Sequence, residues 1–303
     1  MKIYGVYFYN REPIRIMNVV RKIGLLIITV SMIALKTLST TDLSPNSLYN
    51  LLNSKSIVIG ILSIEKHIEF RNAMRRTWLS TGDFDYKFMF DNPTTNLTLE
   101  QNQYNDIIFL NTTFSGKAYK FGEKLLKWFK YARQHFPNAK VIVKSDDDVF
   151  LCPKQIIKSM NTIPDIQKIY YGYKHGNPNI NQVTPTFRVD EMFVGIGIQL
   201  VDRIIKREYC TRDRRYIKKC PKNSLVDTDF GGTSLAYWLK DYDDINGKFD
   251  NQTIVHYSES EKFLNTRKQI LEDIEQVKIC SDFNLYHKAK PKEMYKLWDK
   301  INS

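Results

Sequence analysis

The sequence predicts an α/β protein with a mostly parallel sheet flanked by helices. Two observations predict this fold class. Short apolar runs alternate with longer amphipathic runs from residue 56 onward, and no internal repeat or low-complexity stretch interrupts that order. Strands separated by helices of this length favour parallel pairing through right-handed crossovers. With 303 residues, 43% hydrophobic and 26% charged, the chain has the composition of a globular protein.

The expected elements follow one another in a regular order. Strand-like runs occur at Ile57–Leu62, Tyr86–Phe90, Asp106–Leu110 and Ala139–Val143, and helix-like runs at Phe70–Leu79, Lys117–His135 and Pro153–Met160. In the longest helical run, Leu125, Trp128 and Phe129 share one face, and Pro137 ends the helix. Residues 56–303 are therefore predicted to form one domain.

The N-terminal region predicts a membrane anchor. Ile23–Leu35 is an uncharged apolar run of 13 residues, which is shorter than the roughly 17–25 residues of a spanning helix. Extending the run to Ile14–Leu38 adds apolar positions, and Arg21, Lys22 and Lys36 can snorkel at its ends. Basic residues precede the run, so the positive-inside rule keeps the N-terminus in the cytosol. We expect a cytoplasmic tail (1–22), a signal-anchor transmembrane segment (23–38) and a Ser/Thr/Asn-rich stem (39–55) before a luminal domain. A cleaved signal peptide and a buried helix of a soluble protein are the alternatives.

Sequons and cysteines bear on the compartment. Three N-x-Thr sequons, which begin at Asn96, Asn111 and Asn251, agree with a luminal glycoprotein. The four cysteines form no C-x-x-C pair, which argues against a thiolate metal site or a thioredoxin-like site. In an oxidising compartment they allow three pairings, and Cys210 and Cys220 are close enough in sequence to close a small loop.

The net charge of +12 would suit a polyanionic partner, but its distribution does not indicate nucleic acid. The densest basic patch, between Arg212 and Lys219, is short, and no nucleic-acid-binding motif or zinc-finger spacing accompanies it. We therefore predict a generic basic surface and no nucleic-acid partner.

An acidic run follows the apolar run that begins at Ala139. The segment Lys144–Phe150 contains three consecutive carboxylates, Asp146, Asp147 and Asp148. In an open α/β sheet, ligands bind beyond the carboxyl ends of the strands. Adjacent carboxylates repel one another unless a cation offsets them, and hard oxygen ligands suit Mg²⁺ or Mn²⁺. The segment therefore predicts a divalent cation that bridges a diphosphate, with a solvated Asp-rich turn as the alternative.

Two motifs resemble one known family. Arg71–Trp78 (RNAMRRTW) resembles the R-x-A-I-R-x-T-W signature of the β-1,3-galactosyl- and β-1,3-N-acetylglucosaminyltransferases (glycosyltransferase family 31), and Lys144–Phe150 resembles that family's K-x-D-D-D-V-F. The order of anchor, stem, Arg-rich helix and acidic motif is also similar, over roughly residues 56–256. The resemblance implies a GT-A-like, Rossmann-type fold that holds a UDP-sugar at the strand ends, in a single-pass type II protein of the Golgi membrane.

The resemblance also assigns roles to the motif residues. It implies that Asp148 ligates Mn²⁺ (or Mg²⁺), with Asp146 at the metal or the ribose side and Asp147 between them. Arg71, Arg75 and Arg76 are expected near the nucleotide, where a guanidinium pairs with phosphate. The alternative for each arginine is an ion pair within the protein.

Further site residues follow from the family's later motifs. Its catalytic base lies in E-D-V-x-x-G, and the counterpart here is Val226–Gly232; Asp227 is the expected base, with Asp229 in reserve. An alignment on Gly232 places Thr228 at that position, and an N-cap of the helix around residues 234–240 is the alternative role for the aspartate. His256, after a short apolar run, is expected as a metal ligand.

The remaining family feature is a glycine pair, Gly195 and Gly197, expected at the donor and acceptor loop. The stretch before it, Asp190–Val194, lacks the family's Y-P-x-Y-C residues, which leaves sugar specificity open. The resemblance implies an inverting, metal-dependent transfer of galactose or an N-acetylhexosamine from a UDP-sugar to a glycan acceptor, in β-1,3 linkage. An inactive luminal glycan-binding protein of the same fold and a Mg²⁺-dependent phosphohydrolase are the alternatives; the oligomeric state stays open.

Overall fold

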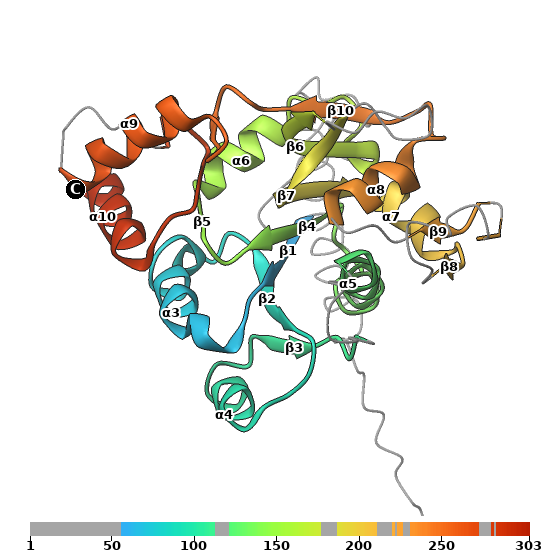
Figure 1. Ribbon diagram of the computed structural model, residues 1–303, viewed down its shortest axis with the longest axis horizontal. Coiled ribbons are helices and arrows are strands. Elements are labelled where there is room, and N and C mark those ends of the chain that lie inside the picture. Colours follow the sequence, from blue (N-terminus) through green and yellow to red (C-terminus); the bar gives the residue numbers. More distant parts are fainter. Residues whose placement is uncertain are drawn as a thin grey trace, which may run out of the picture. The chain divides into compact units, whose positions relative to one another are not determined.

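Seven strands form the central sheet of the computed structural model (Figure 1). Their order is β10 (Asn246–Phe249), β6 (Ile169–Gly176), β7 (Phe187–Gly197), β4 (Val141–Asp146), β1 (Ile57–Leu62), β2 (Asp85–Phe90) and β3 (Ile107–Phe109). β1 pairs in parallel with β2 and β4, β2 with β3, and β10 with β6. β7 runs antiparallel to both of its neighbours. The fold is therefore mixed α/β with a mostly parallel sheet.

The structure describes residues 56–112, 121–176, 187–210, 220–221, 223–226, 231–272, 280–281 and 283–303. These belong to one compact unit, Asn50–Ser303. The expected tail, anchor and stem lie outside the described residues, as do Asp227 and Asp229. Within the described ranges, no helix has both the length and the apolar character that crossing a membrane requires.

Helices cover both faces of the sheet. One apolar cluster joins the sheet to α3 (Ile68–Arg76), α6 (Pro153–Met160), α9 (Ser260–Leu271) and α10 (Pro291–Asn302). A second cluster joins the opposite face to α5 (Phe121–His135), α7 (Ile198–Ile205) and α8 (Gly231–Leu239). α4 (Thr95–Tyr104) lies beside β3. Short 3₁₀ turns occur at η2 (Glu65–His67), η3 (Trp78–Thr81) and η4 (Ile166–Lys168).

The alternation of side chains along β1 explains how one strand serves both clusters. Ile57, Ile59 and Ile61 point into the first cluster, and Val58 points into the second, because successive residues of a strand face opposite sides. Gly60 also faces the second cluster, where a Cβ would lie 2.4 Å from Trp128 Cε2. A glycine at this position therefore lets α5 pack directly on the sheet.

Two smaller sheets complete the described part of the fold. β11 (Ile254–Val255), β12 (Leu285–His287) and β5 (Val149–Leu151) form one, in which β12 is parallel to β11 and antiparallel to β5. β8 (Tyr209–Cys210) pairs with β9 (Leu225–Val226) in the other. Disulfides join Cys152 to Cys280 and Cys210 to Cys220, which selects one of the three pairings that the sequence allowed.

The observed elements agree with most of the expected ones and differ in their ends. The expected helix from Phe70 to Leu79 is α3, which ends at Arg76, followed by the 3₁₀ turn η3. Thr77 separates the two, with φ −115° and ψ −118°, and its hydroxyl donates to Ala73 O at 2.7 Å. Such back-bonding competes with the helical pattern.

Candidate functional site

The carboxyl ends of β1 and β4 open into a cleft of about 250 Å³. Because these strands are parallel, Leu62 and Asp146 pair with each other at the same edge of the sheet. The cleft is lined by Leu62, Ser63, Ile64, His67, Phe121, Lys144, Asp146, Asp147, Asp148, Glu191 and Lys288. All three carboxylates of the acidic run therefore reach one cleft, as the sequence predicted.

Asp147 is the buried member of the acidic run. It accepts a hydrogen bond from Ser63 Oγ at 2.6 Å, and the same oxygen lies 2.9 Å from His67 Nδ1. Burial raises the pKa of the Asp147 carboxyl, although Ser63 and His67 act in the opposite direction. Asp147 thus ties the β4–β5 turn to the loop after β1.

Asp146, Asp148 and His287 form a cluster whose ligand atoms lie within 4.8 Å of one another. Asp148 Oδ1 is 3.7 Å from His287 Nε2. That oxygen and both ring nitrogens of His287 are buried without a hydrogen-bond partner. Burial lowers the pKa of His287 to about 3, so the imidazole is neutral and offers a lone pair. Buried polar atoms without partners are costly. Carboxylates suit Mn²⁺ or Mg²⁺, and a neutral imidazole beside them adds a nitrogen ligand of the kind that divalent transition metals accept. The residues present fit a divalent cation.

The small sheet brings His287 to the acidic run. β12 pairs with β5 so that His287 lies opposite Val149, and Ala289 N donates to Asp148 O at 2.8 Å. The Cys152–Cys280 disulfide joins the same two segments. His287 lies far from the acidic run in sequence, so only this pairing makes the two neighbours. The one sequence signal is that His287 ends a short apolar run, the same pattern that singled out His256.

His256 lies next to this cluster. It is fully buried, its ring centroid is 5.0 Å from that of His287, and its ring stacks on Tyr173 at 4.3 Å. Its Nδ1 is 2.5 Å from Ser258 Oγ, and its Nε2 is 3.5 Å from Asp190 Oδ2. His256 is therefore brought near the carboxylates, but its ring nitrogens face Ser258 and Asp190.

The carboxyl of Asp190 titrates well below its ordinary range. Burial alone would raise its pKa, but His256, the backbone N–H of Met192 and Arg188 together outweigh burial and lower it. Asp190 therefore remains ionised beside His256 at neutral pH.

Two lysines pair with the outer carboxylates. Lys144 Nζ lies 2.5 Å from Asp146 Oδ1 and also donates to Glu191 O at 2.5 Å. Lys288 Nζ lies 2.9 Å from Asp148 Oδ2. Burial would lower the pKa of Lys288, but the adjacent Asp148 raises it. The cleft thus contains cations as well as carboxylates, which suits an anionic ligand.

Glu191 is a cleft residue to which the sequence assigned no role. Its Oε2 accepts from the backbone N–H of Gly232, at the start of α8, at 2.7 Å. Gly232 approaches closely here, since a Cβ on it would lie 2.6 Å from Val189 O. This bond fixes the first turn of α8, directly after the residues in which the catalytic base is expected.

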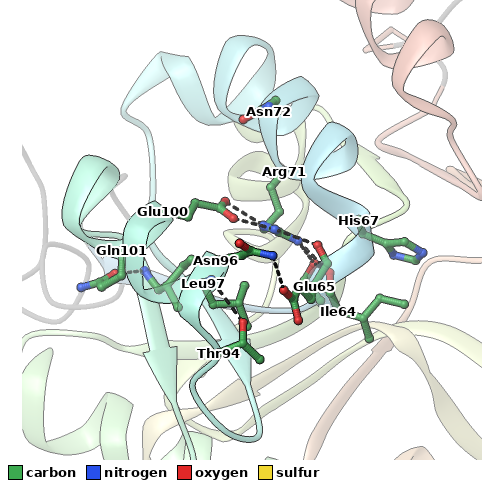
Figure 2. Close-up of polar contacts among 12 residues, drawn as sticks. Ile64, Glu65, His67, Arg71, Asn72, Thr94, Asn96, Leu97, Glu100 and Gln101 are labelled. Carbon is green, nitrogen blue, oxygen red and sulfur yellow. Dashed lines mark hydrogen bonds and ion pairs between the residues drawn. The ribbon is translucent and has the colours of Figure 1, made fainter.

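The arginines of α3 form ion pairs within the protein. Figure 2 shows Arg71 pointing toward Glu100 of α4, which it grips through Nε at 2.8 Å and Nη2 at 2.6 Å. Arg71 Nη1 also donates to Ser63 Oγ at 3.0 Å, and Ser63 in turn bonds Asp147. Arg75 pairs with Glu100 and with Asp106. Arg71 therefore supports the acidic run through Ser63, and the ion-pair alternative describes both guanidinium groups.

Arg76, Gly195 and Gly197 are the other expected site residues that the structure describes. Arg76 is exposed at the end of α3. Gly195 and Gly197 lie in strand β7 instead of a loop. A Cβ on Gly195 would lie 3.0 Å from Met160 Cε, and one on Gly197 would lie 2.3 Å from Gln167 O. Close packing accounts for both glycines, and their contact with a donor stays a prediction.

The sequence is similar to known sugar-transferring proteins. Residues 69–192 match the family model described as galactosyltransferase. Two relatives with the printed name lactosylceramide 1,3-N-acetyl-β-D-glucosaminyltransferase are each 27% identical: the Xenopus tropicalis protein over 141 residues and the Homo sapiens protein over 157 residues. Over this segment, which is less than half of the chain, the sequence resembles that of the galactosyltransferase family.

The similarity to these galactosyltransferase-family proteins is partial. The alignments cover 39% and 45% of this chain, and they span only 36% and 41% of the relatives' own lengths. A solved glycosyltransferase involved in the glycosylation of the major capsid of PBCV-1 is 9% identical, and the match covers 80% of this chain and 98% of that one with a TM-score of 0.41. The matched family segment contains the acidic run and all of α3 except its first residue, Ile68, but neither His256 nor His287.

Proposed function

We propose that the chain is an inverting, metal-dependent hexosyltransferase that moves galactose or an N-acetylhexosamine from a UDP-sugar to a glycan acceptor, forming a β-1,3 linkage. The observation that carries the proposal is the pair of unpartnered ligand atoms, Asp148 Oδ1 and His287 Nε2, at the carboxyl end of β4. The similarity to the galactosyltransferase family supports the reaction class. The sheet, with its cleft at the ends of β1 and β4, is proposed to be GT-A-like and Rossmann-type.

Asp148 and His287 would hold the cation, with Asp146 beside them. A divalent cation there would supply Lewis-acid stabilisation of the departing diphosphate. The protein's own part is electrostatic and positional. Lys144 keeps Asp146 in place and adds positive charge to the cleft. His287, neutral and desolvated, presents a lone pair instead of a competing positive charge.

The acceptor hydroxyl needs a base in an inverting transfer. Asp227 is the proposed base and Asp229 the reserve. Both lie in sequence between β9 and α8, and the Glu191–Gly232 bond fixes the helix that follows.

A luminal, membrane-anchored location in the Golgi remains part of the proposal. Two disulfides support an oxidising compartment. The sequon residue Asn96 is exposed at the start of α4, where a glycan could be attached.

A donor screen tests the proposed activity. The purified full-length chain is incubated with Mn²⁺, each of several UDP-sugars and a galactose-terminated glycan, and both transfer and donor hydrolysis are measured. We expect transfer from a galactose or N-acetylhexosamine donor, and none from Asp148→Asn. Binding of UDP with Mn²⁺ but no transfer or hydrolysis from any donor would favour the non-catalytic glycan-binding alternative. Phosphate release from simple esters would favour a phosphohydrolase.

A further inference from the structure

Lys288 has a backbone conformation that lysine seldom adopts. Its φ is 58°, in the left-handed region that favours glycine, asparagine and aspartate. The neighbouring bond from Ala289 N to Asp148 O and the strand β12 just before it hold the chain in this shape. Residues kept in sparsely populated backbone conformations cluster at functional sites, which makes Lys288 a candidate functional residue.

The two oxygens of Asp148 have different surroundings. Oδ2 lies 2.9 Å from the Lys288 ammonium. Oδ1 faces His287 Nε2 at 3.7 Å and has no hydrogen-bond partner. Asp148 Oδ2 therefore pairs with the Lys288 ammonium, and Asp148 Oδ1 remains available to a metal ion.

Lys288 can move away from its carboxylate partner more easily than Lys144 can. The Lys144 side chain is 8% exposed and has a second partner, the carbonyl of Glu191. The Lys288 side chain is 48% exposed, and its ammonium is bonded to Asp148 alone among the hydrogen bonds described for it. A divalent cation at Asp148 would repel a neighbouring ammonium, and the flexible stem of Lys288 allows it to move within the cleft.

We propose that Lys288 is an exchange cation: its ammonium pairs with Asp148 in the metal-free protein, and a divalent cation displaces it. The displaced Lys288 ammonium then binds the diphosphate of the nucleotide donor. The inference rests on the proposed function, because it assumes that Mn²⁺ and a nucleotide share this cleft. The Lys288 side chain therefore lowers the affinity of the cleft for the metal ion and raises its affinity for the phosphate oxygens.

Two binding measurements on the full-length chain test it. Mn²⁺ affinity is measured without nucleotide, and UDP affinity is measured at saturating Mn²⁺, both by calorimetry. We expect Lys288→Met to bind Mn²⁺ about 2- to 5-fold more tightly, because a half-exposed ion pair is lost. We expect it to bind UDP about 10-fold more weakly, because a charge-assisted bond to phosphate is lost.

Matched variants separate this role from a change in net charge. Lys292→Met removes the same charge from an exposed position on α10 and should change neither affinity. Lys288→Arg should stay close to the wild type in both measurements. Circular dichroism confirms that each variant is folded.

The outcomes distinguish this inference from the proposed function. If wild type and Lys288→Met bind Mn²⁺ and UDP equally, or if Lys288→Met binds Mn²⁺ more weakly, Lys288 is not an exchange cation and the proposed function is untouched. If the wild type binds no Mn²⁺ at all, the metal-dependent function fails, and the exchange fails with it.

Discussion

At the scale of single residues, His287 and His256 differ in what surrounds their ring nitrogens. Both nitrogens of His287 lack hydrogen-bond partners. His256 Nδ1 is bonded to Ser258 Oγ, and His256 Nε2, which also has no hydrogen bond, lies 3.5 Å from Asp190 Oδ2. We predict that His287→Ala lowers Mn²⁺ affinity by at least about 10-fold, because it removes a proposed ligand. His256→Ala should lower the affinity less than His287→Ala does, because the nitrogens of His256 face Asp190 and Ser258 and His256 is not part of the cluster with Asp146 and Asp148. Calorimetry on chelator-stripped protein measures both, and the reverse order would support the assignment of the metal to His256.

Substitution of Arg71 tests whether this residue has a structural role or a nucleotide-binding role. Its side chain is 1% exposed, and its loss leaves Glu100 buried with one fewer cation. We predict that Arg71→Met lowers the free energy of unfolding by about 3 kcal/mol, as for other broken buried pairs. The double variant Arg71→Met/Glu100→Met should recover part of that loss. Urea unfolding measures the effect. A fully stable Arg71→Met with weakened UDP binding would instead favour the phosphate-binding role.

At the scale of the elements, the contact between β1 and α5 depends on a missing side chain. A Cβ at Gly60 would meet both Trp128 Cε2 at 2.4 Å and Met89 Sδ at 2.6 Å. We predict that Gly60→Ala lowers the free energy of unfolding by about 1–3 kcal/mol through overpacking. Gly176→Ala, at the end of β6, is the control, since nothing lies within 4 Å of its Cβ position. Equal midpoints for the two variants in urea would contradict this account of the packing.

At the scale of the whole molecule, the two disulfides close loops of very different length. Cys152 and Cys280 are 128 residues apart, and Cys210 and Cys220 are 10 apart. Chain-entropy arguments give roughly 5 kcal/mol for the long loop and roughly 3 kcal/mol for the short one. We predict that Cys152→Ala/Cys280→Ala lowers the Tm more than Cys210→Ala/Cys220→Ala does. It should also weaken Mn²⁺ binding, because this disulfide joins the segments that carry Asp148 and His287. Retention of full Mn²⁺ affinity would show that the β5–β12 pairing holds Asp148 and His287 together without the disulfide.

The sequence by itself determined much of the local structure. The apolar run Ile57–Leu62 predicted β1, and the proline of Pro153–Met160 marked the start of α6, because hydrophobic pattern and helix-start signals act over neighbouring residues. The acidic run was expected at the carboxyl end of its strand and lies at the end of β4, whereas its role in binding a cation stays a prediction. β7 was not predicted, because an antiparallel strand in the middle of a sheet depends on its partners and not on its own pattern.

The tertiary structure alone decided which histidine joins the carboxylates. His287 meets Asp148 through the register of β12 on β5, and no local signal encodes a pairing between segments so far apart in sequence. It also decided that Arg71 and Arg75 face Glu100, since an arginine pattern on one helix does not say what lies opposite. Local physics fixed the elements of this protein, and contacts between distant segments completed its proposed metal site.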